Sequence, residues 1–233
     1  MNCLPRIPAL APPTLPQAHK AGINIIAATD LWVDIGPYAD MGTGDLIELF
    51  WNGHFVASRV LTAQDTGHTV SLRVPESFIV SGAPWVHYRV MQVGRNPVLS
   101  VATRVAVKLE CPGGPLGDDE NQFLAPVNLP AFIRRRGLNR RQIQRGVPLT
   151  IEPYLNMAAD DEITLRWGDV RMDLPRLMAA DVGRPIHVWV PPAIIVEAGE
   201  DLRLEVTYCI LDRVGNNSRW APARMLKVGR HSL

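Results

Sequence analysis

The stretch "DTGH" (65–68) places a carboxylate near an imidazole, a pair of side chains suited to acid–base chemistry or metal binding. The second half of the chain has Asp181, Gly183 and Arg184 at the matching positions, so the histidine is not shared. The shared residues indicate a turn, because aspartate accepts backbone hydrogen bonds and glycine adopts positive φ. The other histidines lack ligand spacing, and no nucleophile elbow, phosphate-binding loop, HExxH or CxxC motif occurs. The sequence therefore predicts no catalytic residue, no metal site and no cofactor.

Composition and charge disfavour several functional classes. The 233 residues include 24 Lys and Arg and 23 Asp and Glu, for a net charge of +1, so we expect no global attraction to nucleic acid or membranes. No run approaches about 18 apolar residues, so no membrane span is expected. The three scattered cysteines, Cys3, Cys111 and Cys209, form no disulfide framework and indicate reducing surroundings.

The N-terminal residues make a poor signal peptide, because prolines between positions 5 and 16 interrupt any apolar helix. We therefore expect a cytoplasmic location. Secretion or surface exposure by a route without a cleavable N-terminal signal is the alternative.

The strongest charge feature is "RRRGLNRRQIQR" at 134–145. It could bind an acidic protein, a phosphate-rich glycan or nucleic acid. Composition disfavours nucleic acid as a partner, because the whole chain is nearly neutral and has few aromatic residues for stacking. The structural interpretation is a solvated early strand balanced by the acidic residues 118–120. The arginines are Arg134, Arg135, Arg136, Arg140, Arg141 and Arg145.

Two similar proline-rich heptads indicate an internal duplication. "LAPPTLP" occupies 10–16 and "LAPVNLP" occupies 124–130. Further matches follow in the same order: "PYADM" matches "PYLNM", and "DLIELFW" matches "DEITLRW", both at a spacing of 116 positions. Proline cannot donate to a sheet ladder, so we expect each heptad to start its copy and to protect a sheet edge.

Each copy alternates apolar and polar residues with the period of a half-buried strand. In 45–51, Ile47, Leu49 and Trp51 fall on one face, and 161–167 repeats the pattern. Asn52-Gly53 follows directly and is a strong hairpin signal. We expect about seven short strands in each copy, the last of copy one at roughly 100–108, which is typical of a β-sandwich.

Three strings of copy one resemble a tandem immunoglobulin-like module of large bacterial repeat proteins: "GDLIELFWNG", "DTGHTVSLRVP" and "VHYRVMQVGRN". Copy two keeps them as "DDEITLRWGD", "DVGRPIHVWVP" and "LEVTYCILDRVGNN". The resemblance covers nearly the whole chain after residue 10. It implies an immunoglobulin-like fold and stalks, adhesive surfaces or partner-binding modules, and it carries no catalytic residues.

We therefore expect an all-β protein of two tandem immunoglobulin-like β-sandwich domains related by internal duplication. The expected bounds are a tail at 1–9, domain 1 at 10–112, a linker at 113–121 and domain 2 at 122–233. The linker expectation comes from its Pro-Gly-Gly-Pro run and its acidic residues.

Apolar residues on the sheet face opposite the core need a cover. Copy one has Leu46 and Phe50 on this face where copy two has charged residues, and copy two has Trp189 on the next matched strand. The cover is either internal, from the tail or the sister copy, or a partner, for which aromatic and arginine side chains are common contacts.

These observations favour a non-catalytic protein-binding module, not an enzyme. The candidate partner surface combines the six arginines with Leu46, Phe50 and Trp189. The alternative is a carbohydrate- or cell-surface-binding adhesin, in which exposed tryptophans would stack on sugars. The tryptophans considered for this role are Trp32, Trp85, Trp189 and Trp220.

Overall fold

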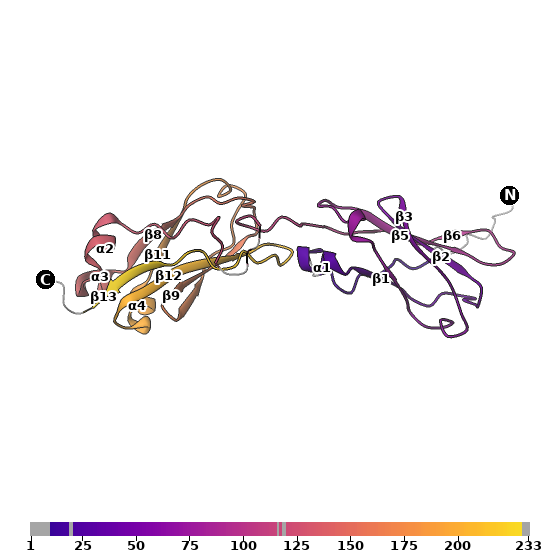
Figure 1. The fold of residues 1–233 in the computed structure, drawn as a ribbon, viewed down its shortest axis with the longest axis horizontal. Helices are drawn as coiled ribbons and strands as arrows, with labels where there is room; N and C mark the ends of the chain where they lie inside the picture. Colours follow the sequence, from indigo (N-terminus) through magenta and orange to yellow (C-terminus); the bar gives the residue numbers. More distant parts are fainter. Residues whose placement is uncertain (1–9, 19–20, 116, 118–119, 230–233) are drawn as a thin grey trace, which may run out of the picture. The chain divides into compact units, whose positions relative to one another are not determined.

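The computed structural model describes residues 10–18, 21–115, 117 and 120–229. The chain divides into two compact units between Leu109 and Glu110 (Figure 1), which we name unit 1 and unit 2. The expected tail at 1–9 lies outside the described residues. The sequence-based bounds of the two domains and of the linker stay a prediction.

Part of the expected linker packs against unit 2. The backbone N–H of Gly113 donates a 2.8 Å hydrogen bond to the carbonyl of Leu155. Gly113 has φ 78°, and a Cβ there would lie 2.6 Å from the Leu124 side chain, so only glycine fits. Two of the three acidic residues expected to hydrate this segment, 118–119, lie outside the described residues.

Unit 1 consists of two antiparallel sheets. β1 pairs with β4, and β2 lies between β3 and β5, with β6 and β7 pairing to β5. The elements are α1 (Ile25–Thr29), β1 (Trp32–Ile35), β2 (Leu46–Trp51), β3 (His54–Val60), β4 (Val70–Arg73), the 3-10 helix η1 (Glu76–Phe78), β5 (Trp85–Met91), β6 (Val98–Leu99) and β7 (Thr103–Arg104).

Unit 2 repeats this layout. β8 pairs with β11, and the second sheet has the order β10-β9-β12-β13. The elements are α2 (Ala131–Arg136), α3 (Arg140–Arg145), β8 (Val147–Ile151), β9 (Glu162–Trp167), β10 (Val170–Asp173), β11 (Ile186–Val190), α4 (Pro192–Ala198), β12 (Asp201–Leu211) and β13 (Arg224–Val228). Each unit is an immunoglobulin-like β-sandwich, and the expected all-β fold is confirmed.

The duplication is visible at matched positions of the two units. β2 and β9 have the same alternation of half-buried and buried residues. Trp51 and Trp167, which end these strands, are 2% and 0% exposed. Ile23 forms a parallel bridge to Val107, as Leu138 does to Val228. The two copies therefore share strand pairing as well as sequence.

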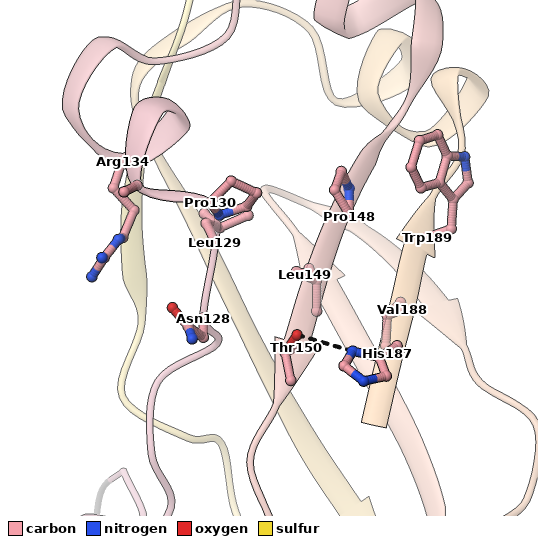
Figure 2. A pocket seen from close by; sticks show the side chains of 11 residues that line it. Asn128, Leu129, Pro130, Arg134, Pro148, Leu149, Thr150, His187, Val188 and Trp189 are labelled. Atoms are coloured by element: carbon pink, nitrogen blue, oxygen red, sulfur yellow. Dashed lines mark hydrogen bonds between the residues drawn. The ribbon is translucent and has the colours of Figure 1, made fainter. Parts of the chain in front are cut away.

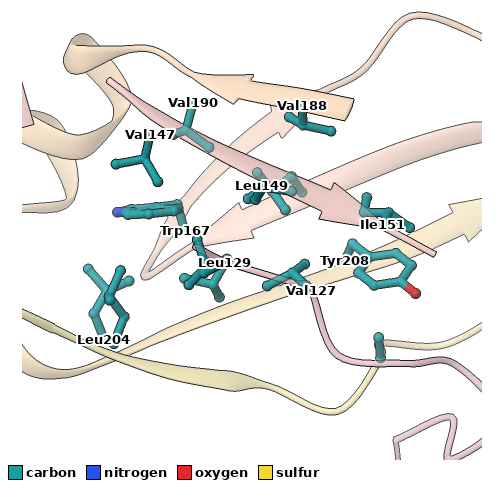
Figure 3. Close-up of a cluster of buried hydrophobic side chains, with 14 of the residues drawn as sticks. Val127, Leu129, Val147, Leu149, Ile151, Trp167, Val188, Val190, Leu204 and Tyr208 are labelled. Carbon is teal, nitrogen blue, oxygen red and sulfur yellow. The ribbon is translucent and has the colours of Figure 1, made fainter. Parts of the chain in front are cut away.

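The core of unit 2 lies between its sheets. Figure 3 shows side chains of β8 and β11 facing those of β9 and β12, with Trp167 and Tyr208 among them. Burying a large apolar side chain stabilises the fold by about 1.5–3 kcal/mol. The Tyr208 hydroxyl donates a 2.9 Å hydrogen bond to the carbonyl of Ala125, so its polar end is satisfied.

The proline-rich heptads cover the edges of β1 and β8. Thr14 exchanges two backbone hydrogen bonds with Asp34 of β1, at 2.9 and 2.8 Å. Asn128 exchanges two with Thr150 of β8, at 2.8 and 2.9 Å. Because neighbouring prolines cannot donate, each heptad pairs with its strand at this one bridge and does not extend the sheet.

The hairpin expected at Asn52-Gly53 joins β2 to β3. Both residues have positive φ, 49° and 83°, as a type I′ turn requires. The last strand expected in unit 1 is broken. Within 100–108 the two-residue strand β7 forms, with isolated bridges at Ser100 and Val107, and β6 ends just before this range.

The arginine-rich stretch forms two short helices, so its interpretation as an early strand is wrong. Asn139 begins α3 with a capping box. Its side chain accepts from the N–H of Gln142 at 3.0 Å, and the Gln142 side chain accepts from the N–H of Asn139 at 2.8 Å. These local bonds favour a helix, while the stretch lacks the apolar alternation that a strand needs.

Candidate functional site

The six arginines of 134–145 are divided between α2 and α3. Within the part of the chain that the structure describes, none of them forms an ion pair. Gly137 and Gly146, with φ 77° and 81°, end the two helices. Unit 2 therefore presents a set of cations whose charges are not offset by contacts to described carboxylates.

A groove of about 510 Å³ lies over the outward face of β8 and β11. Figure 2 shows Arg134 and Trp189 on opposite sides of it, with Pro130 and Leu149 between them. Two of the residues predicted from the sequence therefore line one site. The lining residues that are polar or at least partly exposed are Asn128, Pro130, Ala131, Arg134, Pro148, Thr150, His187 and Trp189.

Trp189 forms an aromatic wall of the groove. Trp189 is 56% exposed, and the Nε1 edge of its indole lies against Gly146. A Cβ at Gly146 would be 2.7 Å from Trp189 Nε1, so glycine is what allows the indole to lie this close to the backbone. Nearby, Thr150 Oγ1 and His187 Nδ1 are joined by a 3.3 Å hydrogen bond. The groove thus offers one aromatic surface and several polar groups.

Unit 1 fills the equivalent positions differently. Arg73 stands in the place of Trp189 and forms a 2.9 Å ion pair with Asp30. Across the sheet, Trp32 faces Arg73, whereas Pro148 faces Trp189. The exposed indole of unit 2 is therefore a feature that the shared fold does not require.

Arg134 also borders a second hollow, of about 480 Å³, together with Arg135 of α2 and Arg224 of β13. We call this hollow the arginine cleft. The Arg224 Nε donates a 3.3 Å hydrogen bond to the carbonyl of Val127. Sequence reasoning missed Arg224. Aligning the two copies at a spacing of 121 positions places Arg224 opposite Thr103, so this cation is one that copy one lacks.

The remaining arginines lie elsewhere on α2 and α3. Arg140 lines a cavity of about 650 Å³ between α3 and α4, together with Ile195 of α4. Arg136, Arg141 and Arg145 are exposed and line neither the groove nor the arginine cleft. The arginine-rich stretch is therefore spread over several surfaces of unit 2.

Leu46 and Phe50 lie in unit 1, on the outward face of β2. The Phe50 ring stacks on His87 at 5.0 Å and meets Phe55 edge-on at 6.2 Å, and the Arg89 guanidinium lies 5.5 Å from its centroid. Burial lowers the pKa of His87. Neighbours in the same sheet thus cover much of Phe50, and a partner contact for Leu46 and Phe50 stays a prediction.

The other tryptophans differ in access. Trp85 is 51% exposed and has the Arg104 guanidinium 5.8 Å from its ring. Trp220 is half-buried beneath Arg166 and Arg171, at 5.0 and 5.7 Å. Cation–π contacts of this kind occupy an aromatic face that a ligand would otherwise use.

The "DTGH" stretch is a turn, as expected. Asp65 accepts hydrogen bonds from the N–H of Thr62 at 2.9 Å and from Arg59 at 2.7 Å. The bonds from Thr62 hold the pKa of Asp65 below its usual value.

Among the described residues, no three His, Cys, Asp or Glu side chains gather as metal ligands. None of the helices within the described residues has the length and apolar character that a membrane span needs.

Comparisons with known proteins found no matching family model and no matching curated protein. Solved structures do match. A chain from work on host cell surface retention of a 1.5-MDa bacterial ice-binding adhesin has TM-score 0.42 and 15% identity. That match covers 96% of this chain and 66%, just under two thirds, of the adhesin chain.

Two further structures cover nearly all of both chains. The fibronectin(III)-like modules of Clostridium thermocellum CbhA have TM-score 0.47 and 13% identity over 95% of this chain and 98% of theirs. The human OSCAR ligand-binding domain has TM-score 0.33 and 11% identity over 94% and 100%. The fold described above follows from the strand pairing of this chain itself.

Proposed function

We propose that the chain is a non-catalytic protein-binding module and that unit 2 holds the partner. The groove over β8 and β11, with the exposed Trp189 and Arg134 at its sides, is the observation that carries the proposal. Tryptophan and arginine are enriched among the residues that dominate protein–protein affinity. Unit 1 has the ion-paired Arg73 in place of Trp189, so folding alone does not explain the exposed indole.

The charge of α2 and α3 supports an acidic partner. Six arginines without ion pairs to described residues create a local positive field on a chain whose net charge is only +1. Such a field accelerates association with an acidic surface and weakens as salt screens it. We therefore expect binding to weaken at high ionic strength.

Capture from extracts of the native cell tests the proposal. The immobilised full chain is compared with Trp189→Ala and with the double variant Arg134→Glu and Arg140→Glu. The control is Arg203→Glu, at an exposed position of β12 outside the groove and the arginine cleft. We expect a protein that the wild-type chain and the control retain, and whose retention falls at least tenfold both in Trp189→Ala and in the arginine double variant. Equal retention by all four chains would contradict the proposal.

A carbohydrate- or cell-surface-binding adhesin is the alternative, and the open indole face of Trp189 favours it. Membership of the bacterial tandem immunoglobulin-like repeat proteins and a surface location belong to this alternative. A glycan array probed with the wild-type chain and Trp189→Ala tests it. Binding to a defined glycan that disappears in the variant would support the adhesin. Absence of binding to every glycan on the array would count against it.

A further inference from the structure

The arginine cleft gathers three guanidinium groups at one hollow. Arg134, Arg135 and Arg224 line it, and none forms an ion pair with a described residue. Each guanidinium has five N–H donors. Only the Nε of Arg135, which donates to the carbonyl of Ala131, and the Nε of Arg224 make hydrogen bonds within the described residues. Most donors of the cleft are therefore available to a ligand.

The shared fold does not require a guanidinium at Arg224. In unit 1 the Oγ1 of Thr103 donates a 3.4 Å hydrogen bond to the carbonyl of Pro13. In unit 2 the Nε of Arg224 donates a 3.3 Å hydrogen bond to the carbonyl of Val127, at the same place in the heptad. A threonine therefore satisfies this carbonyl, and the terminal nitrogens of Arg224 are additional to what the sandwich uses.

We propose that the arginine cleft binds a phosphate monoester on a side chain of the partner protein, an inference that rests on the proposed function. Three like charges bordering one hollow repel each other, so an anion there is stabilised. Guanidinium groups bind phosphate through paired, charge-assisted hydrogen bonds. A phosphate monoester carries about two negative charges near pH 7, against one for a carboxylate, and so offsets more of the cleft's charge.

The neighbouring groove indicates that the phosphate is carried on a peptide. Arg134 and Ala131 line both hollows, so the arginine cleft continues into the groove. Pro130, Pro148 and Trp189 give that groove accessible apolar surface. Apolar side chains on either side of a phosphorylated residue would lie against this surface.

Calorimetric titration of the full chain tests this proposal. The probes are inorganic phosphate, a capped Leu-Pro-phosphoserine-Leu-Pro peptide, the same peptide without phosphate, and glucose 6-phosphate. We expect the phosphopeptide to bind at least tenfold more tightly than the unphosphorylated peptide and glucose 6-phosphate. Arg224→Thr and Arg134→Gln should each weaken phosphopeptide binding at least tenfold, while Arg203→Gln should leave it unchanged.

The variant Trp189→Ala distinguishes binding in the groove from binding in the arginine cleft. It should weaken binding of the phosphopeptide and leave binding of inorganic phosphate unchanged, because Trp189 lines only the groove. Equal affinity for the two peptides, or phosphate binding that survives Arg224→Thr combined with Arg134→Gln, would overturn the proposal. Glucose 6-phosphate binding as tightly as the phosphopeptide would overturn the choice of a peptide.

The two proposals can fail separately. Partner capture that depends on the arginines, without phosphate binding, would overturn only the phosphate site. Thermal unfolding of each variant distinguishes lost binding from lost folding, and Arg224→Thr is expected to fold because unit 1 has threonine at that position.

Discussion

The hydroxyl of Tyr154 donates a 2.9 Å hydrogen bond to the carboxylate of Asp161, whose exposed fraction is 0%. Unit 1 repeats the pair with Tyr38 and Asp45 at the same distance, 116 positions earlier in the sequence. Each carboxylate also accepts the backbone N–H of the residue three positions before it. A buried carboxylate needs such partners, so this pair is a structural element of both sandwiches.

Removing one hydroxyl tests this pair. Tyr154→Phe should lower the free energy of unfolding of unit 2 by about 1–3 kcal/mol, because Asp161 stays buried with one donor fewer. Tyr38→Phe should have a similar effect on unit 1. The control is Tyr88→Phe, whose hydroxyl makes no hydrogen bond with a described residue, and which should change stability little. Chemical denaturation measures all three, and equal losses for Tyr88 and Tyr154 would contradict the role of Asp161.

Gly137→Ala should strongly destabilise unit 2. A Cβ at this position, where φ is 77°, would lie 2.5 Å from the carbonyl oxygen of Lys227. The control is Gly183→Ala, at φ 78° with nothing within 4 Å of the added Cβ. The control should cost about 1 kcal/mol from backbone strain alone. Gly137→Ala should exceed it by more than about 1 kcal/mol, because the clash is with backbone. Equal unfolding midpoints for Gly137→Ala and Gly183→Ala would contradict a destabilising contact between the added Cβ and the Lys227 carbonyl.

Acidification should destabilise unit 1 through His87. Burial lowers the pKa of this imidazole in the folded state, so the unfolded chain takes up the proton first as the pH falls. Stability is therefore lost as the pH falls below about 6.5, the ordinary pKa of histidine. His87→Phe keeps a ring against Phe50 but cannot titrate. The variant should lose less stability between about pH 7 and pH 5, and identical pH profiles would contradict this assignment.

Trp189 and Trp167 should differ sharply as stability determinants. Trp167→Ala removes a side chain that is 0% exposed and should cost about 3–5 kcal/mol. Trp189→Ala removes a side chain that is 56% exposed and should cost less than about 1 kcal/mol. Unfolding in urea compares them. A large loss at Trp189 would indicate a packing role and remove the reason to place a partner there.

The sandwich could be predicted because its determinants are local. Alternation at Ile47, Leu49 and Trp51 specifies a strand with one buried face, and Asn52-Gly53 specifies the turn that follows. The helices α2 and α3 were missed because they are short and lack an apolar period. α2 begins after Pro130 without a side-chain cap, and α3 depends on the capping box of Asn139.

The candidate site could be predicted only in part, because tertiary pairing assembles it. Trp189 was recognised from its register on β11, but the groove also needs Asn128 and Pro130 from the heptad that pairs with β8. Arg224 lies far from Arg134 in the sequence and shares a hollow with it only because β13 runs beside α2.

The most direct test converts the surface of unit 2 to that of unit 1. The double variant Trp189→Arg and Arg224→Thr installs residues that the same fold already accepts in unit 1, as Arg73 and Thr103. Calorimetry measures its affinity for the protein captured by the wild-type chain. We predict affinity at least 100-fold lower, or about 2.7 kcal/mol, with an unchanged unfolding temperature. Undiminished affinity in the folded variant would contradict the claim that unit 2 holds its partner through the groove and the arginine cleft.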